Sequence, residues 1–213
     1  MDQIFEQIGK FKLVPVVKIE RAGDSLALGN AFLEGGLPLA EITFRTDAAQ
    51  ESIRILSKSL PEMLIGAGTV LKVDNVKKAI QAGAKFIVAP GFNPKVVDYC
   101  LEIGIPVIPG INSPTEIEMG LDRGLSVLKY FPAEASGGLK LLKAMSEPYG
   151  DVKFVPTGGI NADNLLEYLS FNRVIACGGT WIARSNLITE GRFDEITRLT
   201  RAAVELIASL HTS

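Results

Sequence analysis

A short apolar run followed by a longer amphipathic segment recurs along this chain of 213 residues, and this repeat most strongly limits the possible folds. Apolar runs rich in branched residues predict strands, and apolar residues at helical spacing predict helices. The expected strands are residues 13–18, 39–43, 64–69, 86–89, 106–109, 127–131, 153–157 and 174–177. The expected helices are one at the N-terminus and residues 24–32, 48–60, 73–82, 94–103, 114–123, 139–146, 163–169 and from 194 onward. This alternation predicts a parallel sheet.

Residues that end and begin helices support this division. Gly83, Gly104 and Gly124 each follow an expected helix and precede an apolar strand, where a left-handed helix end favours glycine. Asn93 precedes a proline, and Ser113 stands three residues before a glutamate, so both are candidates for helix N-caps.

Eight such units without a linker or a break in composition favour one domain, residues 1–213, folded as a (β/α)8 TIM barrel. An open, doubly wound sheet is the structural alternative. In a barrel, functional side chains belong at the carboxyl ends of the strands.

The charge balance excludes some partners. With 22 Lys and Arg against 24 Asp and Glu, the formal net charge is −2 and no polybasic run is present. This argues against nucleic acid and anionic membrane surfaces, and no apolar run is long enough to span a bilayer. A small molecule is therefore the expected partner. Cys100 and Cys177 show neither metal-ligand spacing nor a disulfide framework, and the acidic N-terminus does not resemble a signal peptide, so a cytoplasmic location is expected.

Histidine chemistry is limited to one residue. His211 is the only histidine, and it lies far along the chain from the strand ends. Histidine-based triads and histidine-rich metal sites are therefore excluded, and no metal site is expected. Acid-base catalysis would fall to Glu, Asp, Lys, Tyr or water.

A lysine lies within an apolar strand. Lys129 follows Val127 and Leu128 and precedes two aromatic residues and a proline. Burial disfavours the ammonium form of a lysine, and only the neutral amine attacks a carbonyl to form a Schiff base. The alternative is a lysine at a strand end whose stem lies on apolar surface while its ammonium stays in water.

Three polar residues alternate along the second expected strand. Glu41, Thr43 and Arg45 fall on one face, although a strand buried on both faces should be almost continuously apolar. An internal ion pair between Glu41 and Arg45 is one interpretation. The favoured one is a carboxylate for proton transfer and a guanidinium for an anion.

Glycines follow the last two expected strands. Gly158 and Gly159 follow the seventh, and Gly178 and Gly179 follow the eighth. In barrels these loops, with a helix N-terminus behind them, commonly bind phosphate through backbone N–H groups. The small residues 66–69 and 89–91, at the ends of the third and fourth strands, allow either a close ligand or a tight turn. Together with the lysine, carboxylate and guanidinium, the pattern predicts a Schiff-base aldolase acting on a phosphorylated keto acid.

Five sequence blocks in order resemble the bacterial 2-keto-3-deoxy-6-phosphogluconate aldolases, which often also act as 4-hydroxy-2-oxoglutarate aldolases. The resemblance spans nearly the whole chain. The blocks are EITFRT at residues 41–46, GAGTV at 66–70, KYFPAE at 129–134, PTGGI at 156–160 and GGTW at 178–181.

The resemblance implies a role for each strand-end residue. Lys129 would form the imine with the substrate carbonyl, and Glu41 would move protons through a water molecule. Arg45 and Thr69 would bind the carboxylate, Pro90 and Phe131 would form the wall, and Thr157 would contact the hydroxyl side of the substrate. The implied phosphate contacts are Gly158, Gly159, Gly179 and Thr180. Lys18, at the end of the first strand, could add positive charge to the site or be solvated.

The resemblance also implies pyruvate and glyceraldehyde 3-phosphate as products, no cofactor, a homotrimer, and an N-terminal helix covering the bottom of the barrel. The chain departs from the usual residues at Phe44, Ala89, Tyr130 and Thr180, but no reacting group is lost. Three alternatives stay open: an aldolase for the galactonate-derived epimer, a phosphosugar barrel that works without a covalent amine, and a catalytically silent barrel.

Overall fold

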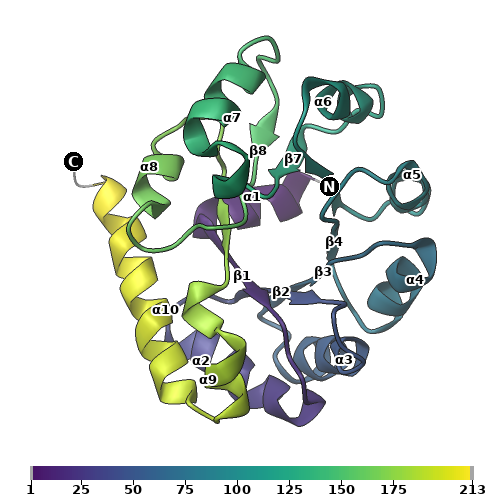
Figure 1. Ribbon diagram of the computed structural model, residues 1–213. Coiled ribbons are helices and arrows are strands. Elements are labelled where there is room, and N and C mark those ends of the chain that lie inside the picture. Colours follow the sequence, from purple (N-terminus) through teal and green to yellow (C-terminus); the bar gives the residue numbers. More distant parts are fainter. Residues whose placement is uncertain (1, 212–213) are drawn as a thin grey trace.

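Parallel strands surrounded by helices make up the computed structural model, which describes residues 2–211 (Figure 1). The strands are β1 (Leu13–Val17), β2 (Leu39–Thr43), β3 (Leu64–Gly68), β4 (Phe86–Val88), β5 (Val107–Ile108), β6 (Gly110–Ile111), β7 (Val127–Tyr130), β8 (Lys153–Phe154) and β9 (Cys177–Gly179). The α-helices are α1 (Asp2–Phe11), α2 (Ser25–Glu34), α3 (Ala49–Ser59), α4 (Val73–Gln81), α5 (Pro94–Glu102), α6 (Pro114–Leu121), α7 (Gly138–Ser146), α8 (Leu165–Leu169), α9 (Ser185–Thr189) and α10 (Phe193–Ala208). Short 3-10 turns are η1 (Ala22–Asp24), η2 (Glu134–Ser136), η3 (Trp181–Ala183) and η4 (Ser209–His211).

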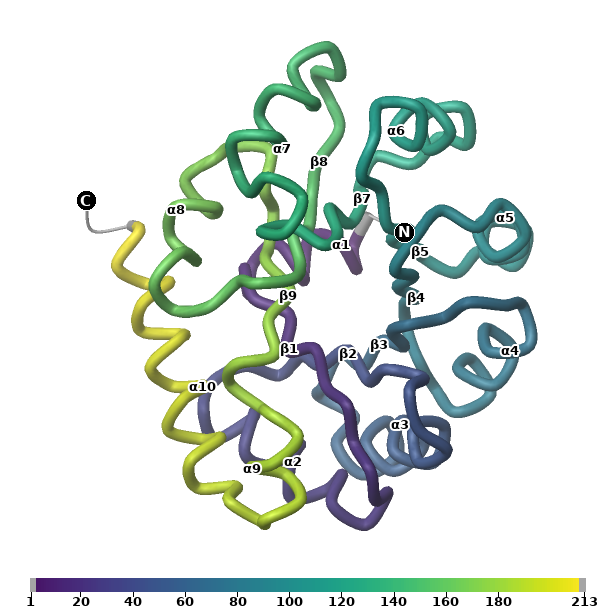
Figure 2. Tube along the Cα trace, in the orientation of Figure 1, coloured from purple at the N-terminus to yellow at the C-terminus, as the bar shows by residue number. Residues whose placement is uncertain are grey.

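The strands form a curled parallel sheet that is divided in two. Six strands pair in the order β5-β4-β3-β2-β1-β9, and three pair in the order β6-β7-β8. Two isolated parallel bridges, Phe154 with Val174 and Thr157 with Gly178, connect the two parts. The chain trace curves round a centre, with most helices outside it (Figure 2). The α/β class and the parallel sheet predicted from the sequence are therefore confirmed.

The predicted strand count was wrong by one, for a backbone reason. The expected strand 106–109 is two short strands, β5 and β6, separated by Pro109, which has no N–H to donate to a ladder. The last strand also differs, because β9 is Cys177–Gly179 and only an isolated bridge forms at Val174. Its glycines pair with β1 through backbone groups, which side-chain propensity does not reveal.

The predicted helix ends are confirmed. Gly83, Gly104 and Gly124 have φ values of +103°, +71° and +71°, in the left-handed region that favours glycine. Asn93 Oδ1 accepts a hydrogen bond from Lys95 N at 3.1 Å, and the Ser113 side chain caps α6. The short helix α9, between β9 and α10, was not predicted.

Helix α1 lies in the middle of the ring in both views, at the end where the strands begin (Figures 1 and 2). Ile8 is fully buried, and a Cβ on Gly9 would lie 3.9 Å from Cβ of Ile175, just before β9. Buried apolar residues of the strands and surrounding helices form one continuous cluster.

Within residues 2–211, no helix is long and apolar enough to cross a membrane. The cellular location stays a prediction.

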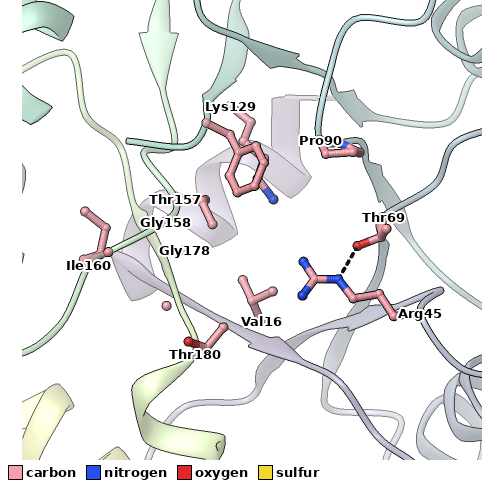
Figure 3. Close-up of a pocket in the computed structure, with 13 residues that line it drawn as sticks. Val16, Arg45, Thr69, Pro90, Lys129, Thr157, Gly158, Ile160, Gly178 and Thr180 are labelled. Atoms are coloured by element: carbon pink, nitrogen blue, oxygen red, sulfur yellow. Dashed lines mark hydrogen bonds between the residues drawn. The ribbon is translucent and has the colours of Figure 1, made fainter. Parts of the chain in front are cut away.

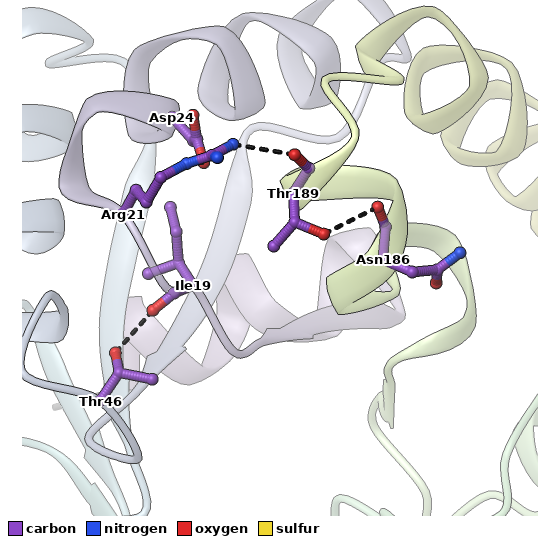
Figure 4. A network of polar contacts seen from close by, with 6 residues as sticks. All are labelled: Ile19, Arg21, Asp24, Thr46, Asn186 and Thr189. Carbon is purple, nitrogen blue, oxygen red and sulfur yellow. Dashed lines mark hydrogen bonds and ion pairs between the residues drawn. The ribbon is translucent and has the colours of Figure 1, made fainter.

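Hydrogen bonds join the segment that follows β1 both to α9 and to the segment that follows β2 (Figure 4). Arg21 donates to the carbonyl of Thr189 at 2.9 Å and to the Asp24 carboxylate at 2.9 Å. Thr46 Oγ1 donates to the carbonyl of Ile19 at 2.6 Å. These bonds hold the segments beyond the carboxyl ends of the strands in fixed relative positions.

Substitution of Gly66 should destabilise the sheet through overpacking. A Cβ at this position would lie 2.2 Å from the ring of Phe86, which is buried in β4. We expect Gly66→Ala to lower the free energy of unfolding by about 1–3 kcal/mol, measured by urea denaturation. Gly91→Ala is the matched control, because no heavy atom lies within 4 Å of its added Cβ. Equal losses in the two variants would contradict this packing argument.

Candidate active site

A pocket opens where the strands end (Figure 3). Every residue predicted for the site, except Glu41, lines it: Arg45, Thr69, Pro90, Lys129, Phe131, Thr157, Gly158, Gly159, Gly179 and Thr180. These residues come from separate parts of the sequence, and the parallel strands bring their carboxyl ends to one edge. Val16, Ile160 and Gly178 complete the lining.

Glu41 does not line the pocket but lies buried directly beside Lys129, which does. Its carboxylate Oε1 is 3.6 Å from Nζ of Lys129, and the two side chains are only 4% and 6% exposed. A small internal space bordered by Glu41, Lys129 and Thr157 lies beside this pair. Nζ also lies 5.4 Å from the centroid of the Phe131 ring. The lysine therefore connects a buried carboxylate to the open pocket.

These positions decide between the alternatives left by the sequence. Lys129 is buried, so the solvated strand-end lysine was the wrong interpretation. The ion pair of Glu41 is with Lys129 rather than Arg45. Oε1 of Glu41 is buried and has no hydrogen-bond partner within residues 2–211. A buried pair without full hydrogen bonding contributes little to stability, which favours a chemical role.

Arg45 and Thr69 form a polar wall on the opposite side of the pocket from Thr180 (Figure 3). Arg45 Nε donates to Thr69 Oγ1 at 3.1 Å. Thr69 has φ of +54°, a conformation that costs energy in a β-branched residue and is concentrated at functional sites. Arg45 is exposed, and its other guanidinium nitrogens lie toward the pocket. This arrangement suits an anionic group such as a carboxylate.

The glycine loop after β8 presents two backbone donors. The carbonyl of Gly158 accepts from Glu134 N at 3.0 Å, and that of Gly159 accepts from Asn164 Nδ2 at 3.1 Å. In a trans peptide the next N–H points the opposite way. The N–H groups of Gly159 and Ile160 therefore point away from these partners, and both residues line the pocket. Neither N–H donates a hydrogen bond within the described chain. The loop can bind an anion.

The helical segments behind the two glycine loops are short. The segment after β9 is η3, a 3-10 turn of three residues, and α8 after the β8 loop has five. Such short turns have little aligned dipole. The individual peptide groups of the loop, rather than a helix, therefore provide the donors.

Several strand glycines make room for functional side chains. A Cβ on Gly68 would lie 2.0 Å from Oε1 of Glu41, and one on Gly178 would lie 2.3 Å from Oγ1 of Thr157. The sequence suggested close ligand approach or turn geometry at residue 68. The structure instead places the side chain of the neighbouring strand across this glycine.

Three lining residues were given no individual role from the sequence. Val16 carries no reactive group, whereas Ile160 and Gly178 belong to the motifs PTGGI and GGTW, which offered a signal for both. Lys18 does not line the pocket. It pairs with Glu20 at 2.6 Å, and both side chains are 43% exposed, which supports the solvated interpretation.

The two cysteines are buried and unpaired. Burial raises the pKa of the Cys100 thiol to about 12, and burial also raises the pKa of Cys177. Neither thiol is therefore activated as a nucleophile. Among residues 2–211, no cluster of three or more His, Cys, Asp or Glu could hold a metal ion.

Comparisons with known proteins agree with this geometry. A family model described as KDPG and KHG aldolase matches residues 4–199. A 2-dehydro-3-deoxy-phosphogluconate aldolase of Haemophilus influenzae is 44% identical over 96% of this chain and 97% of its own length. A KHG/KDPG aldolase of Escherichia coli K12 is 39% identical over 91% of each chain. The crystal structure of a Legionella pneumophila KDPG aldolase, with pyruvate captured as a covalent carbinolamine, has a TM-score of 0.91. It is 37% identical, and the match covers 94% of this chain and 98% of that one.

Removing one member of the buried charge pair should cost more stability than removing both. Lys129→Met leaves the Glu41 carboxylate buried and unpaired, so we expect a loss of about 3–5 kcal/mol in the free energy of unfolding near neutral pH. The double variant Lys129→Met/Glu41→Gln should recover part of this loss, because the unpaired charge is gone. Urea denaturation of Lys129→Met, Glu41→Gln and the double variant measures the coupling free energy between the two residues. If the losses of the two single variants simply add up in the double variant, the predicted coupling is contradicted.

Proposed function

The chain belongs to the KDPG and KHG aldolase family, and we propose that Lys129 is the amine through which it works. The protein is a class I aldolase that cleaves 2-keto-3-deoxy-6-phosphogluconate to pyruvate and glyceraldehyde 3-phosphate through a Schiff base. The observation that most supports Lys129 is its burial at the floor of the pocket, 3.6 Å from a buried carboxylate. The carbinolamine in the Legionella structure is the matching precedent.

Lys129 provides the covalent step in this proposal. After Lys129 passes a proton to Glu41, the neutral amine attacks C2 of the keto acid and forms a carbinolamine. Glu41 then returns this proton, through a water molecule, to the carbinolamine hydroxyl, which leaves as water and gives a protonated imine. The imine accepts the electron pair of the C3–C4 bond as it breaks, so a neutral enamine forms instead of a carbanion. Protonation at C3 and addition of water then release pyruvate and the free lysine.

Glu41 provides the proton transfers. It would accept the proton of the C4 hydroxyl through a water molecule during cleavage and return a proton to C3 of the enamine. Support comes from the position of Oε1, which is buried, without a hydrogen-bond partner within residues 2–211, and close to the amine. The space shared by Glu41, Lys129 and Thr157 is next to the reacting atoms in this assignment.

The pocket walls would bind the remainder of the substrate. Arg45 and Thr69 would bind the carboxylate, supported by their hydrogen bond and their place on one wall. Pro90 and Phe131 would enclose the pyruvyl group, and Thr157 would contact the hydroxyl side. The proposed phosphate contacts are Gly158, Gly159, Gly179 and Thr180. The same site is proposed to cleave 4-hydroxy-2-oxoglutarate to pyruvate and glyoxylate, with the phosphate contacts unused.

We also propose that residues 1–213 form one closed (β/α)8 barrel. The two isolated bridges between the sheet parts support closure on one side. On the other side, β5 and β6 are separated only by Pro109, whose carbonyl accepts from Lys129 N at 2.9 Å. A homotrimer and a cytoplasmic location stay predictions, and the trimer rests on the family resemblance.

Three alternative functions make different demands on the site. An aldolase for the galactonate-derived epimer would use the same lysine, so the relative turnover of the two epimers separates it. A barrel that binds phosphosugars without covalent chemistry would tolerate Lys129→Arg and would show no dependence on pyruvate. A silent barrel would be stabilised by ligand without turnover.

Borohydride reduction in the presence of pyruvate should attach a reduced pyruvyl group to Lys129, because reduction traps the imine. Peptide mass spectrometry locates the adduct. Lys18→Met is the matched control, since Lys18 directly follows β1, pairs with Glu20 and does not line the pocket, so the variant should leave the adduct unchanged. An adduct on another lysine, or none in folded wild-type protein, would refute the assignment.

Loss of the carboxylate should be less damaging than loss of the amine. We expect Glu41→Gln to lower kcat by roughly 10² to 10⁴, the usual contribution of general acid-base catalysis, because water can partly replace a proton shuttle. Lys129→Met should lower kcat further, since the electron sink disappears. Pyruvate release measures both. Glu20→Gln, at an exposed carboxylate, should leave kcat unchanged, and a larger loss in Glu41→Gln than in Lys129→Met would reverse the proposed roles.

A further inference from the structure

Glu134 lies where the segments after β7 and β8 meet, next to the glycine loop of the pocket. Its backbone N–H donates to the Gly158 carbonyl at 3.0 Å, and Ala133 N donates to the Thr157 carbonyl at 2.9 Å. These bonds extend the β7–β8 pairing beyond the strands. The backbone at Glu134 and the glycine loop therefore form one hydrogen-bonded unit.

The side chain of Glu134 makes a second contact with this loop. A Cβ on Gly159 would lie 2.6 Å from both Cβ and Cγ of Glu134, so the glutamate stem lies directly against this glycine. Oε1 of Glu134 accepts a hydrogen bond from the hydroxyl of Tyr168, which is on α8 and only 1% exposed. The glutamate is thus fixed between the loop and a buried phenol.

The Tyr168 hydroxyl stays protonated and can donate a hydrogen bond. Burial, the hydrogen bond to Glu134 and the negative charge of that carboxylate all raise the pKa of Tyr168. The phenol therefore keeps its proton at neutral pH and donates a hydrogen bond to the Glu134 carboxylate. Asn164, just before α8, also donates to the Gly159 carbonyl. The contacts of Tyr168 and Asn164 therefore both connect the loop region to α8.

These contacts determine where the two loop N–H groups point. The Gly158 and Gly159 carbonyls are held by Glu134 and Asn164, so the following N–H groups of Gly159 and Ile160 point away from these two residues. Both N–H groups belong to residues that line the pocket. Both glycines have positive φ, +104° and +81°, and glycine backbone is the most easily rearranged. The loop keeps this orientation only if something else holds it.

We propose that Glu134, held by Tyr168, is a positioning residue that fixes the glycine loop in the orientation that binds the substrate phosphate. The inference rests on the proposed function, in which this loop contacts phosphate. Glu134 touches neither the reacting atoms nor the substrate, so its effect should be on binding of the phosphorylated end and not on the chemical step.

Steady-state kinetics on two substrates tests this role. Tyr168→Phe and Glu134→Ala should each raise KM for 2-keto-3-deoxy-6-phosphogluconate by roughly two- to tenfold, the equivalent of one lost hydrogen bond. Neither variant should change kcat, or KM for unphosphorylated 4-hydroxy-2-oxoglutarate. The inhibition constant of inorganic phosphate, measured with the unphosphorylated substrate, should rise by the same factor.

Two further variants separate position from charge and from general stability. Glu134→Gln keeps an oxygen that accepts from Tyr168 but removes the charge, so its KM for the phosphorylated substrate should rise less than that of Glu134→Ala. Tyr149→Phe removes another tyrosine–glutamate hydrogen bond, from Tyr149 to Glu118 at 2.8 Å, which lies before β8 at the opposite end of that strand. It should leave both KM values unchanged.

The outcomes distinguish the inference from the function on which it rests. If wild-type enzyme prefers the phosphorylated substrate but Tyr168→Phe leaves its KM unchanged, or weakens both substrates equally, the positioning role is overturned. A loss in Glu134→Gln equal to that in Glu134→Ala would also overturn it, in favour of a charge effect. If wild-type enzyme shows neither inhibition by phosphate nor preference for the phosphorylated substrate, the phosphate assignment of the loop itself fails.

Discussion

The charge pair between Lys129 and Glu41 is the interaction on which the architecture of the site depends. The two groups lie 3.6 Å apart among apolar residues, and Oε1 of the carboxylate has no hydrogen-bond partner within residues 2–211. Removing such groups from water costs more than their attraction returns when hydrogen bonding is incomplete. The continuous apolar cluster around them must therefore supply the stability that keeps both side chains buried. A rigid setting of this kind keeps reacting groups oriented without rearrangement during catalysis.

Parallel strands make such a setting possible because they bring distant sequence segments to one edge. Each functional side chain then needs space beside its neighbour, and glycines on adjacent strands provide it. Gly68 leaves room for Glu41, and Gly178 leaves room for Thr157. Glycine is thus required at these positions by the packing of functional groups, independently of any contact with a ligand. A glycine in one motif block is therefore explained by the side chain that the block on the adjacent strand places beside it.

The two ends of the pocket are suited to anions by different means. Arg45 contributes a charged side chain whose direction is fixed by a hydrogen bond to Thr69. Thr69 itself has a positive φ, which is strained for a β-branched residue. The glycine loop contributes uncharged peptide N–H groups instead, held by bonds to their neighbouring carbonyls. A fixed guanidinium suits a planar carboxylate, and a row of peptide donors suits a group with several oxygens. The asymmetry agrees with a substrate that carries a carboxylate at one end and a phosphate at the other.

The sequence by itself determined the alternation of strands and helices, the glycine and asparagine helix ends, and nearly all the residues that line the pocket. Those features depend on local periodicity, on backbone conformation or on reactive groups, all of which are written in the residue types. Only the tertiary structure decided that Glu41 pairs with Lys129 rather than with Arg45, that Pro109 separates two strands, and that the helical segments behind the glycines are short. These outcomes depend on which neighbours the fold brings together across the sheet, and neither period nor propensity contains that information.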